Sequence, residues 1–349
     1  SYIYWFFLIA LVPGVIIGAN ALGFETNVRK AIAFNISGPV CLGVSAIYCM
    51  ARDITFQQLK QVLIAMTLPI ATATTYIFLF TPSVKDVVTN TQSNFEASGG
   101  YGPNQVSTIL GLGMFLFFVQ LLLNSKDKLT TAVNTILLVI VSYRAIVTFS
   151  RGGVMTGLAM MGFLSIFTFF ILNAQAKMRL IFYGIIGLIL SAAIWGYSSQ
   201  ETGGMIDKRY ANQSASGVEK ESQLSGRETL MSTEMQMFME NPFLGVGVGK
   251  NKEYREELTG IEAASHNEIT RMVAEHGMFG IFAFIILVTT PLFRFLANTR
   301  NIFIISFVVF WALTINHAAM RLAAPAFVYA LSLLNVKFTQ ENETVVHRE

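Results

Sequence analysis

Charged residues are scarce in this sequence. Asp, Glu, Lys and Arg together make up 13% of its 349 residues, whereas hydrophobic residues make up 53%. The mean hydropathy is +0.55. This composition excludes an ordinary soluble domain, because a soluble core cannot bury so much apolar surface. The formal net charge of +3 is also too small to indicate nucleic-acid binding.

Cysteine and histidine are rare as well, with two and four copies. Cys41 and Cys49 lie in one apolar stretch, and no further Cys or clustered His accompanies them. This disfavours both a disulfide framework and a metal site. No cluster of carboxylates has the spacing of a metal site either, so we expect neither a metal nor another cofactor.

Long apolar runs are abundant instead. We count ten of about 17 to 25 residues, the length of a membrane-spanning helix. They cover residues 2–19, 33–50, 59–80, 105–123, 130–149, 152–172, 180–197, 277–296, 302–318 and 322–337. Backbone groups in hydrocarbon must bond internally, so each run should be a helix. The sequence predicts an all-α polytopic membrane protein with at least ten transmembrane helices. Because the chain begins with Ser1 rather than Met and enters a span at once, we expect either a trimmed product or a fragment that lacks earlier helices.

The Lys and Arg residues of the short loops predict the orientation. When the ten spans alternate, most of these residues fall on one side, which should be cytoplasmic. The long segment 198–271, which holds 12 of the chain's 21 acidic residues, then lies outside the cytoplasm. The predicted organisation is seven transmembrane helices in 1–197, an external helical subdomain in 198–271, three helices in 272–337 and a cytoplasmic tail in 338–349.

An amphipathic helix is predicted within the external segment. SGRETLMSTEMQMF (225–238) places Leu230, Met231, Met235 and Phe238 on one helical face. Ser225 and Glu228 fit a capping box, which puts Arg227 in the first helical turn. The helix dipole prefers acids there, so an Arg suggests an anionic ligand. The alternative is an exposed Arg bound to a loop carboxylate.

A second arginine follows a break in the apolar run 130–172. SRGG at 150–153 predicts a tight external turn and leaves Arg151 at the start of the next helix, where backbone N–H groups favour anions. Arg144 lies two turns earlier and deeper in the membrane. A charge at that depth usually lines a polar cavity or pairs internally. The alternative to a functional role is that Arg144 snorkels to the membrane surface or holds an internal acid, and both interpretations stay open.

His266 lies where polar sequence passes into a membrane span, in SHNEITRMVAEHGMFGI (265–281). Ser265 and Glu268 fit another capping box, so we expect His266 in the first turn of a helix that continues into the span. The positive helix terminus should lower its pKa and keep it neutral, able to accept a proton. Gly277 and Gly280 are expected to allow close helix packing. The alternative is an ordinary loop histidine.

The predicted topology places Arg151, Arg227 and His266 on one membrane surface. The arginines could clamp a phosphate or pyrophosphate while His266 takes a proton from an attacking hydroxyl. Further candidates for substrate binding are Arg144, Arg209, Asn267 and Arg321. LGVGVGKN (244–251) departs from the phosphate-loop pattern at its first and last residues, and we interpret it as a flexible hinge.

The same motifs resemble the O-antigen ligase and O-antigen polymerase superfamily (Wzy_C) over roughly residues 100–320. They are SRGG at 150–153, SGRE at 225–228, ENPFLGVGVGK at 240–250, and His266-Asn267 followed by nine residues and Gly277-x-x-Gly280. The resemblance implies catalytic roles for His266, Arg151 and Arg227. It also implies about twelve spans, an inner-membrane location, a periplasmic active site and a donor glycan on undecaprenyl pyrophosphate, without metal or nucleotide.

Our first interpretation is an inverting O-antigen ligase that transfers the glycan to lipid A core in lipopolysaccharide synthesis. Its expected partners are the undecaprenyl-pyrophosphate-linked donor, the lipid A core acceptor and membrane lipids. A polymerase that extends lipid-linked repeats is the main alternative, and a protein O-glycosyltransferase is another. Arg144 and the ten spans would also suit an anion transporter, although the polar residues gather on one face and no second half matches the first.

Overall fold

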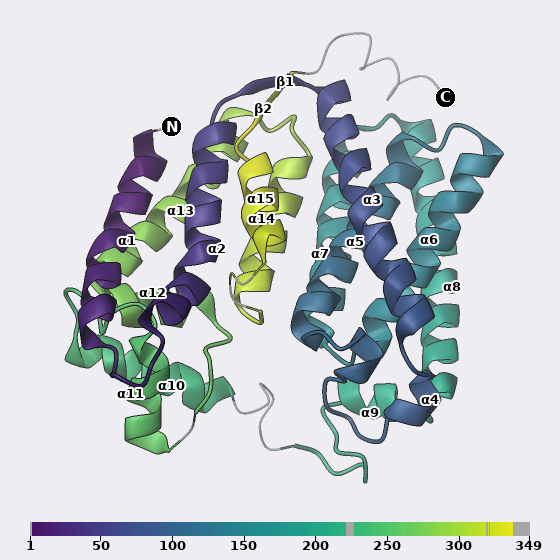
Figure 1. Cartoon of the computed structure of the whole chain (residues 1–349). Helices are drawn as coiled ribbons and strands as arrows, with labels where there is room; N and C mark the ends of the chain where they lie inside the picture. Colours follow the sequence, from purple (N-terminus) through teal and green to yellow (C-terminus); the bar gives the residue numbers. More distant parts are fainter. Residues whose placement is uncertain (1, 221–226, 261, 319, 321, 338–349) are drawn as a thin grey trace. The chain divides into compact units, whose positions relative to one another are not determined.

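Figure 1 shows the chain as a computed structural model that describes residues 2–220, 227–260, 262–318, 320 and 322–337. The elements are α1 (Tyr2–Ala21), α2 (Val28–Cys49), β1 (Asp53–Thr55), α3 (Phe56–Phe80), α4 (Val84–Val87), η1 (Glu96–Ser98), α5 (Pro103–Leu123), α6 (Lys128–Val147), α7 (Arg151–Ile171), α8 (Ala174–Glu201), α9 (Met205–Tyr210), α10 (Arg227–Glu240), α11 (Lys250–Thr259), α12 (Glu268–His276), α13 (Met278–Ala297), α14 (Phe303–Ile315), α15 (Ala323–Leu331) and β2 (Asn335–Lys337). The two short strands pair with each other.

The predicted all-α polytopic membrane class is confirmed. Within the described ranges, eight helices are long and apolar enough to cross a membrane, namely α1, α2, α3, α5, α6, α7, α8 and α13. The two other predicted spans contain α14, with 13 residues, and α15, with 9. The count of at least ten transmembrane helices stays a prediction.

The chain divides into two compact units. The first unit combines residues 1–52 with 222–335, and the second combines residues 53–221 with 336–349. The sequence-based division separates transmembrane, external and cytoplasmic segments. The two compact units do not show on which side of a membrane a segment lies, so that division stays a prediction.

In the first unit, α1, α2, α13, α14 and α15 share an apolar core. Its centre holds three large aromatic side chains, Tyr4, Trp311 and Tyr329. The hydroxyl groups of Tyr4 and Tyr329 are 2.8 Å apart, and Tyr329 donates to the carbonyl oxygen of Leu287. The shorter helices α10, α11 and α12 lie together at one end of α1, α2 and α13 (Figure 1). This end carries His266.

In the second unit, α5 is the most buried of the long helices and is packed by α3, α6 and α7. Glycines bring α5 and α7 close: a Cβ at Gly153 would lie 2.1 Å from the carbonyl carbon of Ser107, and one at Gly111 would lie 2.1 Å from the carbonyl oxygen of Gly153. Close backbone contact through small residues is typical of membrane helices. Gly153 of the SRGG turn therefore fixes the start of α7, where Arg151 stands.

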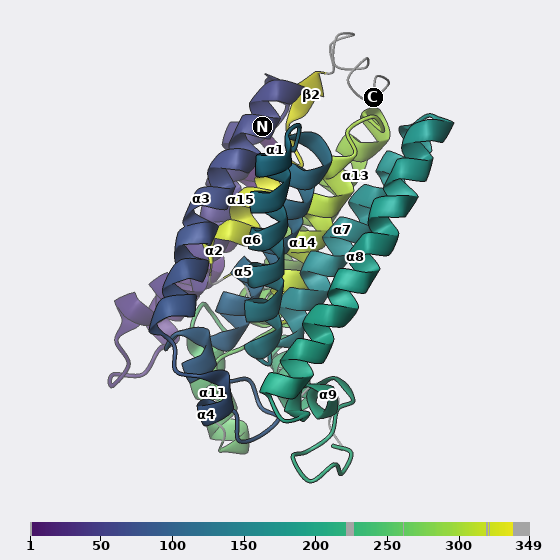
Figure 2. The same cartoon turned by 90° about the vertical axis from the view of Figure 1, so that its right-hand side faces the viewer.

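The longest helix, α8, lies on the outside of the second unit (Figure 2). Among its 28 residues only Ser198 is buried, although the helix is strongly apolar. An apolar helix that buries so little against protein is suited to contact lipid.

Candidate functional site

Helix α10 begins at Arg227, which confirms the predicted helix, while Ser225 of its capping box lies outside the described residues. The predicted apolar face is partly wrong. Met235 is 47% exposed, and the buried side chains are Thr233, Glu234 and Met237. A carboxylate can occupy this face because the Nη2 atom of Arg255 lies 2.5 Å from the Oε1 atom of Glu234.

His266 lies immediately before α12, not in its first turn. The N-cap is Asn267, whose Oδ1 atom accepts hydrogen bonds from the backbone N–H groups of Ile269 and Thr270. The predicted capping box of Ser265 and Glu268 is therefore wrong. The hydroxyl of Ser265 instead donates to the carbonyl oxygen of Asn267 at 2.9 Å. This turn presents His266 from a loop anchored at the helix terminus.

The predicted continuous helix from His266 into the membrane is also wrong, because Gly277 separates α12 from α13 with φ 59° and ψ −136°. A Cβ at Gly277 would lie 2.7 Å from the backbone of Phe243 and Gly245. A Cβ at Gly280 would lie 2.2 Å from the carbonyl oxygen of Met272. The two glycines therefore permit close contacts, but with a loop and with α12.

A buried charge network anchors α12. Arg271 binds Glu268 and lies 2.6 Å from the carboxylate of Glu275. Its Nη2 atom also donates to the carbonyl oxygen of Asn35 in α2, at 3.0 Å. Glu268 accepts a hydrogen bond from the backbone N–H of Met320. Sequence reasoning missed this network, although the spacing of Glu268, Arg271 and Glu275 places all three on one helical face.

The segment interpreted as a flexible hinge is a buried, well-bonded loop. Gly245, Gly247 and Gly249 all have positive φ, which lets the backbone turn inward between buried Val246 and Val248. The backbone N–H groups of residues 246, 247 and 248 donate to the carbonyl oxygens of residues 274, 275 and 14. That of Gly249 donates to Glu275 at 2.9 Å. The hinge interpretation was wrong because the sequence does not reveal these bonds.

Beside this loop, His276 provides a pH-dependent contribution to stability. Its Nδ1 atom is buried without a hydrogen-bond partner among the described residues. Burial, with a smaller contribution from the charge of Arg271, lowers the pKa of His276 to about 3. The unfolded chain, with a His pKa of about 6.5, binds more protons between these values, so the free energy of unfolding falls as the pH drops below 6.5.

We therefore expect His276 alone to remove about 2 kcal/mol of stability between pH 7 and pH 5. The measurement is the melting temperature of the detergent-solubilised protein at both values. Other buried groups also titrate in this interval, so the decisive quantity is the difference from His276→Gln, which should lose less stability. Equal losses in both proteins would contradict this assignment.

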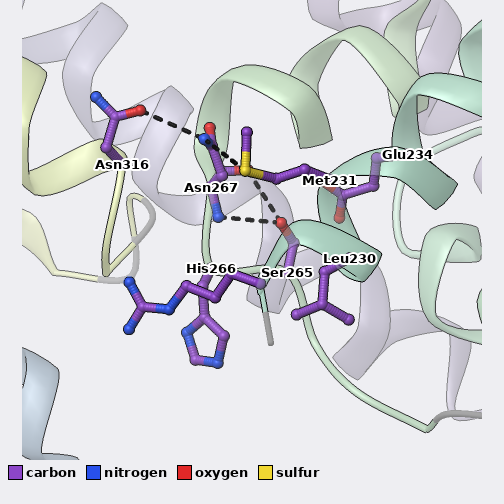
Figure 3. Close-up of a pocket in the computed structure, with 8 residues that line it drawn as sticks. Leu230, Met231, Glu234, Ser265, His266, Asn267 and Asn316 are labelled. Carbon is purple, nitrogen blue, oxygen red and sulfur yellow. Dashed lines mark hydrogen bonds between the residues drawn. The ribbon is translucent and has the colours of Figure 1, made fainter. Parts of the chain in front are cut away.

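Arg227 and His266 line the same pocket, a cavity of about 270 Å³ in the first unit. Its other lining residues are Leu230, Met231, Glu234, Ser265, Asn267 and Asn316. Figure 3 shows the imidazole of His266 directed away from the side chains of Asn267 and Glu234. The Nδ2 atom of Asn267 lies 3.3 Å from the Oδ1 atom of Asn316. Sequence reasoning did not find Glu234, which lies in α10 with Arg227, or Asn316, which directly follows α14.

In the second unit, Arg209 lies beside the turn that carries Arg151. Its Nε atom donates to the carbonyl oxygen of Phe149 at 2.9 Å, and Phe149 has a positive φ of 59°. Lys220 donates to Thr91 at 2.8 Å. Burial raises the pKa of Tyr210 to about 12, while the charges of Arg151 and Arg209 oppose this rise. Burial and the same two charges lower the pKa of Lys220, so this part of the unit is electropositive.

Arg144 is buried in the second unit and donates from its Nη2 atom to the carbonyl oxygen of Ile77 and to the hydroxyl of Thr81. These contacts hold the end of α3 through a carbonyl and a hydroxyl oxygen, so the partners found are internal but are not the expected acid. Arg321 lies outside the described residues. The structure thus brings Arg227 and His266 to one pocket and places Arg151 near Arg209.

The comparisons with known proteins bear on these same segments. Residues 136–285 match a family model described as O-antigen ligase (Wzy_C). No curated protein matches the chain. The matched region runs from α6 into α13 and includes Arg151, Arg227 and His266. Over residues 136–285 the chain is therefore similar to the O-antigen ligase (Wzy_C) family.

Proposed function

We propose that the chain is an O-antigen ligase that transfers O-antigen polysaccharide from undecaprenyl pyrophosphate to a hydroxyl of lipid A core. The family domain supports the coarser statement that the protein is a glycosyltransferase-like enzyme of O-antigen processing, of ligase or polymerase type. The observation that carries the finer proposal is the pocket that joins Arg227 to His266 within the matched region.

In the proposed reaction, His266 accepts the proton of the acceptor hydroxyl as its oxygen attacks the anomeric carbon of the donor sugar. The bond from that carbon to the pyrophosphate oxygen breaks on the opposite face, so the configuration inverts. Undecaprenyl pyrophosphate leaves with the bonding electrons. Arg227, which lines the pocket with His266, holds the leaving group, whose negative charge grows as the bond breaks. His266 then releases its proton to water.

The dimensions of the pocket suit a compact group. A volume of about 270 Å³ lies just below the roughly 300 to 1,000 Å³ of ordinary small-molecule pockets. A pyrophosphate with the adjoining sugar is a small fraction of a lipid-linked polysaccharide, so the glycan chain and the polyprenyl tail must lie outside the cavity. Leu230 and Met231 provide an apolar wall, while Arg227 provides the positive charge.

We place this enzyme in the bacterial inner membrane with its active site facing the periplasm. The eight apolar helices support a multi-pass membrane protein. The side is inferred from the Lys and Arg bias of the short loops, which assigns His266 and both arginines to the external surface.

The proposal is tested by the choice of acceptor. Purified protein is incubated with lipid-linked polymer and, in separate reactions, with lipid A core or with lipid-linked single repeats. We expect lipid A core to gain the polymer, which a shift in gel mobility detects. Extension of the single repeats alone would identify a polymerase and overturn the ligase assignment. Transfer to neither acceptor would overturn both.

A further inference from the structure

The carboxylate of Glu234 lies at the wall of the His266 pocket, yet the proposed reaction gives it no role. Glu234 is 1% exposed and Arg255, its partner, is fully buried. The two side chains form an ion pair at 2.5 Å. Arg255 also binds the hydroxyl of Thr233, the neighbour of Glu234 in α10, at 3.2 Å. The pair therefore ties α11 firmly to α10.

Both members of this pair also form hydrogen bonds with the segment 263–270, which contains His266. Arg255 donates from its Nη1 atom to the carbonyl oxygen of Ala263, before His266. Thr270, after His266, donates its hydroxyl proton to the Oε2 atom of Glu234 at 2.5 Å. The segment is thus held on both sides of His266.

Helix α10, which carries Glu234, also carries Arg227. Arg227 lies seven residues before Glu234, two turns earlier and on nearly the same helical face. A grip on the segment 263–270 from α10 therefore fixes the loop of His266 relative to the helix that presents Arg227. We propose that Glu234 and Arg255 are a positioning pair, which sets the placement of His266 against Arg227 in the pocket.

A purely stabilising role is a weaker explanation of this pair. Two buried charges lose their hydration, and a hydrophobic pair of similar volume is often at least as stable. The hydrogen bonds of an ion pair are directional, so they fix the relative positions of the groups that they join. Apolar contacts have no such directionality. Catalysis is sensitive to such geometry, because a misplacement of about 1 Å can cost about 100-fold in rate.

The test must separate positioning from folding, since the loss of one buried partner leaves an uncompensated charge. Glu234→Met combined with Arg255→Met removes both charges at similar volume. Thr270→Val removes only the hydroxyl that binds Glu234, whereas Thr270→Ser retains it. Tyr254→Phe is the matched control, because Tyr254 binds the exposed Glu240 of the same helix α10.

We expect the double variant to melt like the original protein but to lose about 100-fold in kcat, with little change in the KM for the lipid-linked donor. Thr270→Val should lose about tenfold in kcat, Thr270→Ser should restore it to within about twofold, and Tyr254→Phe should stay within about twofold. Unchanged kcat in Thr270→Val, or a change in KM alone, would overturn the inference. If the double variant does not fold, the two Thr270 variants decide.

This inference rests on the proposed function, so His266→Ala is measured in the same assay. Normal turnover by His266→Ala would refute the proposed role of His266 itself. Lost turnover in His266→Ala, together with normal turnover in Thr270→Val, would refute only the positioning pair.

Discussion

Turnover by a His266→Ala variant is expected to fall by about 10²- to 10⁴-fold, the usual contribution of general acid–base catalysis. His266 lines the pocket together with Arg227 and precedes the N-cap of α12. Its removal takes away the proposed proton acceptor and leaves the capping interactions of Asn267 in place. The measurement is single-turnover transfer by purified protein with donor already bound.

The variant must still insert, melt normally and bind the lipid-linked donor, because the proposed role of His266 concerns the proton alone. Donor affinity and melting temperature are therefore measured beside the rate. Near-normal transfer by a folded His266→Ala protein would show that His266 is an ordinary loop residue and that another group takes the proton.

Arg227→Lys and Arg151→Lys should each lower turnover at least tenfold, about 1.4 kcal/mol of barrier. A guanidinium offers a planar fork of donors that fits two phosphate oxygens, and an ammonium cannot reproduce it even though the charge remains. Because the charge on the leaving group grows as the bond breaks, the loss should appear mainly in kcat. Turnover is measured at saturating lipid-linked donor.

Lys252→Ala and Lys85→Ala are the controls for charge outside the site. Lys252 pairs with Glu262, and Lys85 lies 3.1 Å from Glu201. Exposed pairs of this kind contribute only about 0 to 1 kcal/mol, so turnover should change less than about twofold. Full turnover in Arg227→Lys would refute its proposed contact with the leaving group. Full turnover in Arg151→Lys would refute a catalytic role for Arg151.

The membrane class could be predicted because transfer into lipid depends on composition over a whole helix. Hydropathy is less informative for residues 302–318 and 322–337, where the helices are shorter than the predicted spans. Of the 13 residues of α14, eight are buried against protein, including Phe310 and Trp311. An apolar run that fills a protein core resembles one that faces lipid, and hydropathy alone does not locate its ends.

The site could be predicted only in part, for an equally physical reason. The electropositive residues at helix termini were identified, but the capping pattern of residues 265–268 was misassigned. Glu268 is engaged by Arg271 and by the backbone of Met320, contacts that local sequence does not show. Asn316 lies 49 residues from its partner Asn267. Such pairings arise from the fold, so local spacing could not reveal them.

The hydrogen bond between Tyr4 and Tyr329 joins residues that are 325 positions apart, and it has a consequence for biosynthesis. During translation α1 and α2 emerge before the second unit, and the remainder of their own unit follows only after the second unit has been made. At about 5 to 20 residues per second, residues 53–221 take roughly ten to thirty seconds to synthesise. During that time α1 and α2 are in the membrane without α13, α14 and α15, so the second unit can fold before the pocket of His266 exists.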